Sequence, residues 1–213
     1  LYHLSNYNKV LNQRNRLLKD FSVYNESQAM LDVLDEQLVL YGSDLIRLRS
    51  VFVSELNEIL RQIHSSLSGR KETLVLEYEA NACVDMFENA LKKNREKDVR
   101  TRLTNAGPHR DDLCFLINGI DIRKYGSQGQ QRTAALSLKL AEIELVKQNV
   151  KDTPVLLLDD VLSELDSSRQ KYLLESIHDI QTMITCTGID DFVSYNFQIN
   201  KLFQVICGTV HEK

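Results

Sequence analysis

A glycine-containing turn carries the first residue types that could do chemistry. Gly126-Ser127-Gln128-Gly129-Gln130 stands at the head of a helical pattern that runs from about residue 130 to 148. Free backbone N–H groups and the positive end of the helix dipole favour an anion such as phosphate at a helix start. Ser127 adds a hydroxyl donor, and Gly129 lets a ligand approach the backbone closely. Ordinary helix capping produces the same pattern, so the turn needs a second element beside it to predict an anion site.

That second element is an apolar run, Val155 to Leu158, followed by Asp159 and Asp160. The run has no polar alternation, which is typical of a strand buried on both faces of an α/β sheet. Ligands bind at the carboxyl ends of such strands. There, one carboxylate could hold Mg²⁺ while the other orients a water as general base. The alternative is that both aspartates only solvate the end of a buried strand.

The neighbouring elements predict a sheet that would position these groups. A helix is expected from Ser167, which stands three residues before Gln170 in a capping-box pattern, and a strand from Thr182 to Thr187. The order strand, helix, strand predicts a parallel pair with a right-handed crossover. Upstream, Asn118-Gly119 between apolar runs predicts a β-hairpin with a type I′ turn. A last strand is expected from about residue 202 to 206.

The first half of the chain reads as helical. One helix is expected from about residue 5 to 22, and a second, much longer one after Asn25, which forms a capping-box pattern with Gln28. Its apolar residues repeat with alternating steps of three and four: Leu31, Leu34, Leu38, Tyr41, Leu45, Leu48, Phe52, and then, after a stutter, Leu56, Ile59 and Ile63. An arm that holds a partner and a helix that packs on its neighbours both fit, and no second helix of matching length favours a coiled coil. Thr73 to Tyr78 predicts a strand.

A basic helix is expected from about residue 81 to 100. Its far end carries Lys92, Lys93, Arg95, Lys97, Arg100 and Arg102. These residues are candidates for contact with a DNA backbone. The alternative is a solvated face with ion pairs four residues apart: Glu88 with Lys92, Glu96 with Arg100, and Asp98 with Arg102.

Composition narrows the class of protein. The 213 residues suit one large domain or two smaller ones, and 43% hydrophobic residues are enough for a core. The net charge of −4 leaves no global nucleic-acid footprint, so any DNA contact would be a local patch. The four cysteines lie far apart, which favours reduced thiols in a cytoplasmic protein. No apolar run approaches the roughly 20 residues that span a bilayer.

Together these motifs resemble a known family. Ser127–Gln130 is similar to the signature motif of ABC-type ATPases, Val155–Asp160 to their Walker B strand, and Ser163–Asp166 to their D-loop. More narrowly, Gly107–Leu113 followed by Tyr125–Thr133 closely resembles RecF, a family of bacterial recombination and repair ATPases related to SMC proteins. Ordered motifs at coherent spacing are far more specific than any of them alone.

The resemblance implies an α/β fold, namely the C-terminal part of an ABC-type ATPase head joined to a mostly helical second lobe. Residues 1–102 would form the helical arm, and residues 103–213 the C-terminal half of the head. It further implies ATP and Mg²⁺ as cofactors, ATP-dependent homodimerisation on DNA, and work with RecO and RecR to load RecA at gapped or damaged DNA.

The resemblance also assigns roles to single residues. Asp159 would serve Mg²⁺ and Asp160 would be the catalytic base, while Ser127 and Gly129 would contact the γ-phosphate of ATP bound to the opposite subunit. Asp166 would lie at the dimer seam. The nucleotide-binding set as a whole is Ser127, Gln128, Gly129, Gln130, Asp166, Thr185 and Thr187.

This sequence departs from the ABC pattern in three respects. The second Walker B acid is Asp160 where many ABC proteins have Glu, and Thr185-Cys186-Thr187 occupies the switch region without a His. No G-x-x-x-x-G-K-[ST] loop occurs in the sequence, and the family keeps it in a preceding N-terminal half. We therefore expect slow hydrolysis at most, no tight ATP binding by this chain alone, and an exposed apolar sheet surface. A non-enzymatic module that binds DNA or a partner is the alternative; another SMC-like head would need a longer arm.

Overall fold

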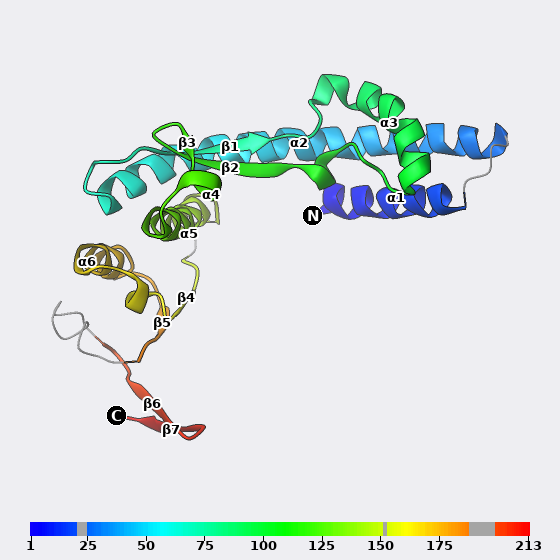
Figure 1. Ribbon diagram of the computed structural model, residues 1–213. Helices are drawn as coiled ribbons and strands as arrows, with labels where there is room; N and C mark the ends of the chain where they lie inside the picture. The colour runs from blue at the N-terminus through cyan, green and yellow to red at the C-terminus, as the bar shows by residue number, and fades with distance from the viewer. Residues whose placement is uncertain (21–24, 151–152, 188–198) are drawn as a thin grey trace.

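The computed structural model describes residues 1–20, 25–150, 153–187 and 199–213. The molecule is extended and bent (Figure 1). Helices α1, α2 and α3 form one end, a small antiparallel sheet lies along α2, and α5, α6 and a parallel strand pair form the other end. The predicted mixed α/β class with a mostly helical arm is confirmed at this level.

The long helix α2 (Asn25–Leu67) spans 43 residues, about 65 Å at 1.5 Å per residue. It runs beside α1 (Tyr2–Lys19), which begins three residues earlier than predicted and ends at Lys19. The predicted end of the first helix, residues 21 and 22, lies outside the described residues, as does the side chain of Asn25 with its predicted cap. The long helix is present as predicted, and it contributes to all three hydrophobic cores of the described chain.

The predicted apolar seam of α2 is correct at its ends and wrong in the middle. Leu48 and Phe52 are 59% and 47% exposed. The buried line passes instead through Ile46, Val53 and Leu60, each seven residues after the last. The reason is that α2 has different neighbours along its length, with α1 and α3 at one end and β1 and α5 at the other. A helix that changes partners also changes the face it buries.

Helix α3 (Phe87–Thr101), with a short 3₁₀ turn before it (Val84–Met86), packs across α2 at Gly42. A Cβ at Gly42 would lie 2.5 Å from Phe87 Cε1 and 3.0 Å from Tyr7 Cε2. Phe87 and Tyr7 are both fully buried. The glycine therefore permits the close packing of three helices, although its helix propensity alone marks it as a weak point.

A buried ionic cluster joins the same three helices. Arg14 of α1 is completely buried; its Nε donates to Asp35 at 2.6 Å and its Nη1 to Asp98 at 2.8 Å. Arg95 Nη2 also pairs with Asp35, at 2.6 Å. The predicted pair of Asp98 with Arg102 is therefore wrong, because Asp98 points inward to Arg14. The predicted pair of Glu88 with Lys92 is confirmed, at 2.5 Å.

The sheet along α2 is built from β1 (Leu74–Glu79), β2 (Asp112–Ile117) and β3 (Ile120–Asp121), paired antiparallel in that order. The β2–β3 hairpin turns at Asn118 and Gly119, with φ of 51° and 81°, so the predicted I′ turn is confirmed. Asn57 of α2 bonds to both the N–H and the carbonyl of Leu76, which ties the helix to the edge strand.

The Gly107–Asp112 loop has a structural role. It forms a short 3₁₀ turn at Pro108–Arg110, and Asp111 accepts from Arg49 Nη1 at 2.8 Å, from the Asn81 N–H, and from Tyr78. Burial, followed by the nearby Asp111 carboxylate, raises the pKa of Tyr78 above its usual value. The loop thus fastens α2 to both β1 and β2.

Helix α5 (Gln128–Val150), which follows the short α4 (Ile122–Tyr125), is buried on two sides. Ala134, Ala141 and Leu145 pack with α2 and the sheet. Leu136 and Leu140 pack on the opposite side with the parallel strands and α6. Helix α5 therefore connects the sheet along α2 to the final part of the chain.

The parallel pair consists of β4 (Leu156–Asp159) and β5 (Thr182–Thr185), and α6 (Ser167–Ser176) lies between them in sequence, after a 3₁₀ turn at Leu162–Glu164. The predicted parallel strand–helix–strand unit is confirmed. Its predicted burial on both faces is wrong: Leu158 is buried, but Leu157 is 69% exposed. Helices α5 and α6 cover only the Leu158 face.

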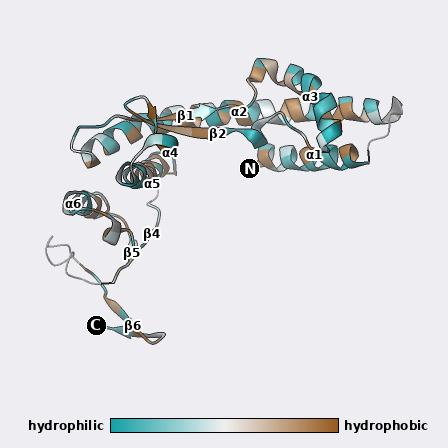
Figure 2. Ribbon diagram, viewed as in Figure 1, coloured by the Kyte–Doolittle hydropathy of each residue, from teal (hydrophilic) through white to brown (hydrophobic). Residues whose placement is uncertain are grey.

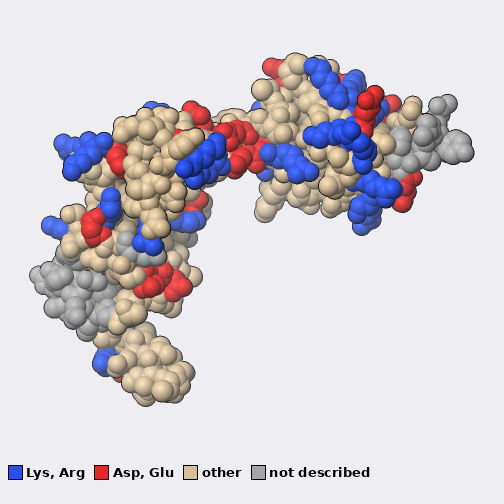
Figure 3. All heavy atoms as spheres, in the orientation of Figure 1, with Lys and Arg blue, Asp and Glu red and all other residues tan. Residues whose placement is uncertain are grey.

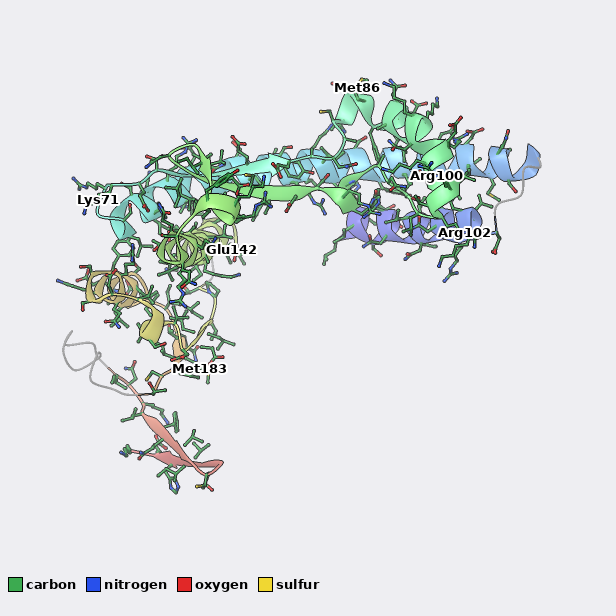
Figure 4. The ribbon with its side chains drawn as sticks, viewed as in Figure 1. Lys71, Met86, Arg100, Arg102, Glu142 and Met183 are labelled. Atoms are coloured by element: carbon green, nitrogen blue, oxygen red, sulfur yellow. The ribbon has the colours of Figure 1, made fainter. Side chains whose placement is uncertain are left out.

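The exposed face is apolar. Leu157 pairs in register with Met183, which is 65% exposed, and Val155 is 55% exposed. Figure 4 labels Met183 at this end of the molecule. The expectation of exposed apolar sheet surface is confirmed here.

The chain ends in a hairpin of β6 (Phe203–Ile206) and β7 (Thr209–Glu212). The sequence predicts the first strand and misses the second, although Cys207 and Gly208 form its turn with φ of 47° and 81°. Every residue of both strands is exposed, including the apolar Val205. Figure 2 shows hydrophobic colouring along part of this hairpin.

The predicted division at residue 102 separates segments that are joined in space. Strand β1, from the arm side of that boundary, pairs with β2 from the other side over six residue pairs. Helix α2 likewise contacts α5 and α6. The division into two domains stays a prediction, and the contacts show how closely the two parts are connected.

Candidate functional site

The Ser127 turn is a capping box at the start of α5. Ser127 Oγ accepts from the Gln130 N–H at 3.2 Å, and Gln130 Oε1 accepts from the Ser127 N–H at 3.0 Å. Each side chain thus satisfies the other's backbone donor. The capping explanation that the sequence left open is therefore correct for Ser127 and Gln130.

Capping leaves other donors of the turn available. Within the described residues, no hydrogen bond takes up the N–H groups of Gln128 and Gly129, and both residues are exposed. A Cβ built on Gly129 would meet nothing closer than Ser127 Oγ, at 4.0 Å. Packing within the chain therefore does not require a glycine here, whereas close approach by a ligand from outside would. The start of α5 offers two free N–H groups to an anion.

The Gln130 side chain continues the capping box into the protein. Its Nε2 donates to Glu72 Oε1 at 2.9 Å. The other oxygen of Glu72 lies 3.4 Å from Nε2 of His64, a fully buried residue near the end of α2. His64 Nδ1 lies 2.9 Å from Ser137 Oγ on α5. The Ser127 turn is therefore connected through Gln130 to Glu72 and His64, which are not part of the sequence motifs.

The acidic strand end is organised by Thr185. Its hydroxyl donates to Asp159 Oδ1 at 2.5 Å, and the Asp160 N–H lies 3.0 Å from the same hydroxyl oxygen and 3.2 Å from the Thr185 carbonyl. Asp160 has φ of +50°, a left-handed conformation that Asp tolerates better than most residues. The parallel pairing of β4 with β5 thus brings Asp159, Asp160 and Thr185 together.

Both carboxylates at this edge are open to solvent, and Thr187 is exposed two residues beyond Thr185. A Mg²⁺ site of the kind that nucleotide enzymes use needs only one or two carboxylates, because water and phosphate complete the octahedron. Asp159 fits this role, since Thr185 occupies one of its oxygens and orients the other. Within the described residues, no group of three or more His, Cys, Asp or Glu residues could hold a metal by itself.

Asp166, rather than Ser167, is the N-cap of α6. Its Oδ1 accepts from the Arg169 N–H at 3.1 Å, and its Oδ2 pairs with Arg169 Nη1 at 2.7 Å. The predicted helix start at Ser167 is confirmed, and the predicted cap is wrong because the preceding Asp reaches the same free donors. Asp166 is 55% exposed at the side chain, so its predicted place at a dimer seam stays a prediction.

The basic residues of α3 divide into paired and unpaired ones. Arg95 is bound to Asp32 and Asp35, and Lys92 to Glu88. Within the described residues, no ion pair engages Lys93, Lys97, Arg100 or Arg102. Figure 4 labels Arg100 and Arg102 at the end of α3 near α1, and Figure 3 shows basic side chains gathered over this part of the molecule.

The sequence motifs missed Glu72 and His64. Glu72 stands in the Ser68–Thr73 turn region, and His64 sits in a helix whose pattern predicts only packing. The role of His64 cannot be predicted from residue spacing in the sequence, because its partners Ser137 and Glu72 come from other parts of the chain.

The fold and these contacts define a mixed α/β protein in which a glycine-containing helix start and an acidic strand end are both open to solvent. Comparison with known proteins then relates it to a known family: the chain is a homologue of RecF and matches part of the length of RecF proteins. "DNA replication and repair protein RecF" of Lachnoclostridium phytofermentans is 57% identical over 212 residues, which are 100% of this chain and 59% of that protein. The protein of the same name from Agathobacter rectalis is 57% identical over 210 residues, 99% of this chain and 58% of its own length.

Solved structures agree with this assignment. "Structure of the recombination mediator protein RecF-ATP in RecFOR pathway" matches with a TM-score of 0.86 at 34% identity, over 100% of this chain and 58% of that one. The corresponding "RecF-ATPrS" structure matches with a TM-score of 0.85 at 36% identity, over 99% of this chain and 58% of that one. The chain thus spans less than two thirds of its relatives. No protein-family model matches it.

Proposed function

We propose that this chain forms the signature and Walker B part of a RecF-type ABC ATPase, which works with RecO and RecR to load RecA at gapped or damaged DNA. The observation that carries the proposal is the joint contact of Asp159 and Asp160 with Thr185 at the carboxyl end of a parallel strand pair. The relatives' names, which include ATP and the RecFOR pathway, support it.

In this proposal the chain's residues serve two nucleotide sites. Asp159 holds Mg²⁺, which neutralises phosphate charge when bound, and Asp160 accepts the proton of an attacking water. Gln128 and Gly129 offer their N–H groups, and Ser127 its hydroxyl, to the γ-phosphate of ATP on a second subunit. Asp166 lies at the seam of that ATP-dependent homodimer, and Thr187 with Thr185 lies beside the γ-phosphate.

The P-loop cradle for the β- and γ-phosphates does not occur in this sequence. The test therefore adds the remaining part of a RecF protein as a separate polypeptide and measures Mg²⁺-dependent ATP hydrolysis. We expect slow hydrolysis by the mixture and none by the chain alone. Asp160→Asn should reduce the rate of the mixture by roughly 10²–10⁴-fold, as loss of a general base does.

Asp179→Asn is the matched control, because Asp179 is also an exposed aspartate of the same end of the molecule, 77% exposed at the side chain. It should leave the rate unchanged. Equal rates for Asp160→Asn and the parent mixture would reject the catalytic role.

A second function, contact with DNA, is favoured by the unpaired basic residues of α3. Figure 4 labels Arg100 and Arg102 at the end of α3 near α1, and the last turn of α1 carries two further basic residues, Arg16 and Lys19. Each phosphate contact adds to the salt dependence of binding. Lys92 and Arg95 contribute less in this proposal, because carboxylates already pair with them.

Fluorescence anisotropy with a gapped duplex tests this surface. Combining Lys97→Ala with Arg102→Ala should weaken binding and lower the slope of log affinity against log salt by about 2, which is about one unit for each lost phosphate contact. Lys171→Ala on α6 is the control and should change neither quantity. An unchanged salt slope in the double variant would exclude this face.

The location of the protein in the cell is also a proposal. No helix in the described parts of the chain is both long and apolar enough to cross a membrane. All four cysteines are free thiols. Reduced thiols and DNA as a partner are in keeping with a cytoplasmic location.

A further inference from the structure

The Ser127 turn is attached to the end of α2 through one carboxylate. Glu72 accepts from Gln130 Nε2 at 2.9 Å with one oxygen, and its other oxygen lies 3.4 Å from His64 Nε2. Gln130 Oε1 in turn accepts the Ser127 N–H. The path from His64 to Ser127 is therefore continuous, with Glu72 and Gln130 as its only intermediates.

The hydrogen bonds of His64 fix where its proton lies. Ser137 Oγ donates its hydrogen to the Thr133 carbonyl at 2.7 Å, so towards His64 it acts as an acceptor. His64 Nδ1 must then carry the N–H. In the neutral ring Nε2 is consequently a bare acceptor, and it faces the Glu72 carboxylate.

Two acceptors that face each other at 3.4 Å repel. Among the residues that the structure describes, His64 Nε2 and Glu72 Oε2 are both buried without a hydrogen-bond partner. A second proton on His64 reverses the interaction, because the imidazolium Nε2–H can donate to Glu72. The contact between His64 and Glu72 is therefore repulsive when His64 is neutral and attractive when His64 is protonated.

The charges around His64 come from two further elements. Burial is the main reason that the pKa of His64 is lowered; Glu72 opposes the shift, and Arg169 of α6 adds to it. Arg169 also pairs with Asp166, the D-loop-like residue. The cluster therefore lies where α2, α5 and α6 meet, next to both motifs that the proposed nucleotide sites use.

We propose that Glu72 is a positioning residue for the Ser127–Gln130 turn, and that protonation of His64 changes how Glu72 holds that turn. The turn's role toward ATP rests on the proposed function, whereas the coupling itself is a property of this chain. Protonation draws Glu72 toward His64 and away from Gln130, which shifts the amide that holds the Ser127 N–H.

Nuclear magnetic resonance on the 213-residue chain tests the coupling without nucleotide. We expect the Ser127 amide signal to move between pH 8 and pH 5 with the same midpoint as the His64 ring, below the ordinary histidine value of about 6.5. In Glu72→Gln the Ser127 amide should stop following His64, because a neutral amide is not drawn to the imidazolium. Glu58→Gln, an exposed substitution on α2, should behave like the parent chain.

A Ser127 signal that stays constant through the His64 titration would overturn the proposal. So would a signal that still follows His64 in Glu72→Gln. His64→Gln is a second variant for the case that Glu72 changes disturb folding, and it should abolish the transition in Ser127 while leaving the signals of the β2–β3 hairpin unchanged.

The ATPase mixture supplies a second readout. Glu72→Ala should lower kcat by roughly five- to tenfold, the effect of about one lost hydrogen bond, with little change in KM for ATP. Glu72→Gln should restore most of the rate, since its side-chain oxygen can still accept from Gln130, and should flatten the pH profile. An unchanged rate and pH profile in Glu72→Ala would count against positioning.

The outcomes separate the two proposals. If the Ser127 amide follows His64 but no mixture hydrolyses ATP, the coupling stands and the proposed function fails. If Asp160→Asn abolishes hydrolysis while the Ser127 amide ignores His64, the proposed function stands and this inference fails.

Discussion

The two ends of the molecule differ in whether their charged groups are buried and paired or exposed to solvent. At the end formed by α1, α2 and α3, Arg14, Asp35 and Asp98 are buried and paired with one another. At the other end, Asp159 and Asp160 are exposed, and a solvent-facing strand residue, Leu157, lies beside them. The first arrangement joins three helices through buried ion pairs. The second leaves donors, acceptors and apolar surface for something outside the chain.

The buried cluster should show the largest effect of any single change. Arg14→Ala leaves Asp98 buried without its cation and Asp35 with Arg95 alone, and breaking a buried pair in this way typically costs about 3–5 kcal/mol. Urea unfolding followed by circular dichroism measures the loss. Arg16→Ala, on the exposed face of the same helix, should stay within about 0.5 kcal/mol of the parent chain. Similar losses for both variants would mean that the cluster contributes no special stability.

Substitutions of two helical glycines, one at each end of the molecule, test this difference. Gly42→Ala places a methyl group 2.5 Å from Phe87 Cε1, and we expect a loss of about 1–3 kcal/mol from overpacking. Gly129→Ala meets open space and should leave the free energy of unfolding unchanged or slightly higher. The same Gly129→Ala chain should lose ATP hydrolysis in the mixture with the remaining RecF part.

This pair separates structural from ligand-dependent glycines. If Gly129→Ala destabilised the chain as much as Gly42→Ala, the open space at the start of α5 would have to be occupied within the protein. Full hydrolysis by Gly129→Ala would instead show that no ligand approaches the turn closely.

The apolar strand face predicts an effect on association rather than on folding. Leu157 and Met183 lie side by side and exposed, so the chain should self-associate. Leu157→Lys should reduce the mass measured by light scattering and leave the urea midpoint unchanged. Leu158→Ala, one residue further and buried, should instead lower stability by about 2–5 kcal/mol. A parent chain that is monomeric would refute the role of this face.

The pH dependence of stability should be the smallest effect. Burial is the main cause of the lowered pKa of both His64 and His109. The unfolded chain therefore binds more protons just below the usual histidine pKa of about 6.5, and the free energy of unfolding should decrease as the pH falls from 7 toward 5.

Urea unfolding at several pH values measures this slope. His109→Gln removes one of the two histidines with a lowered pKa and should flatten the slope, although the variant is less stable at pH 7 because Tyr7 loses its 2.7 Å bond to Nδ1. His178→Gln, an exposed change, should leave the slope intact. A slope that His109→Gln does not alter would assign the pH dependence to other groups.

Local chemistry in the sequence determined much of this molecule. Asn118 and Gly119 specify the hairpin because both tolerate positive φ, and the apolar period of α2 specifies a long helix. The signature-like turn, the acidic strand end and the parallel strand pair also follow from short-range patterns. The family resemblance added ATP, Mg²⁺, RecO and RecR only as implications, and the identity of 57% to a RecF protein confirms the resemblance itself.

Only the tertiary structure decided which polar and charged side chains pair with one another inside the protein. Asp98 belongs to Arg14 rather than Arg102, and Gln130 is held by Glu72, because segments 58 or more residues apart meet in space. It also decided that Leu157 is exposed, since helices cover only one face of β4. Sequence patterns report what a residue can do along its own helix or strand. Which partner it finds depends on how the long helix α2 brings distant segments together.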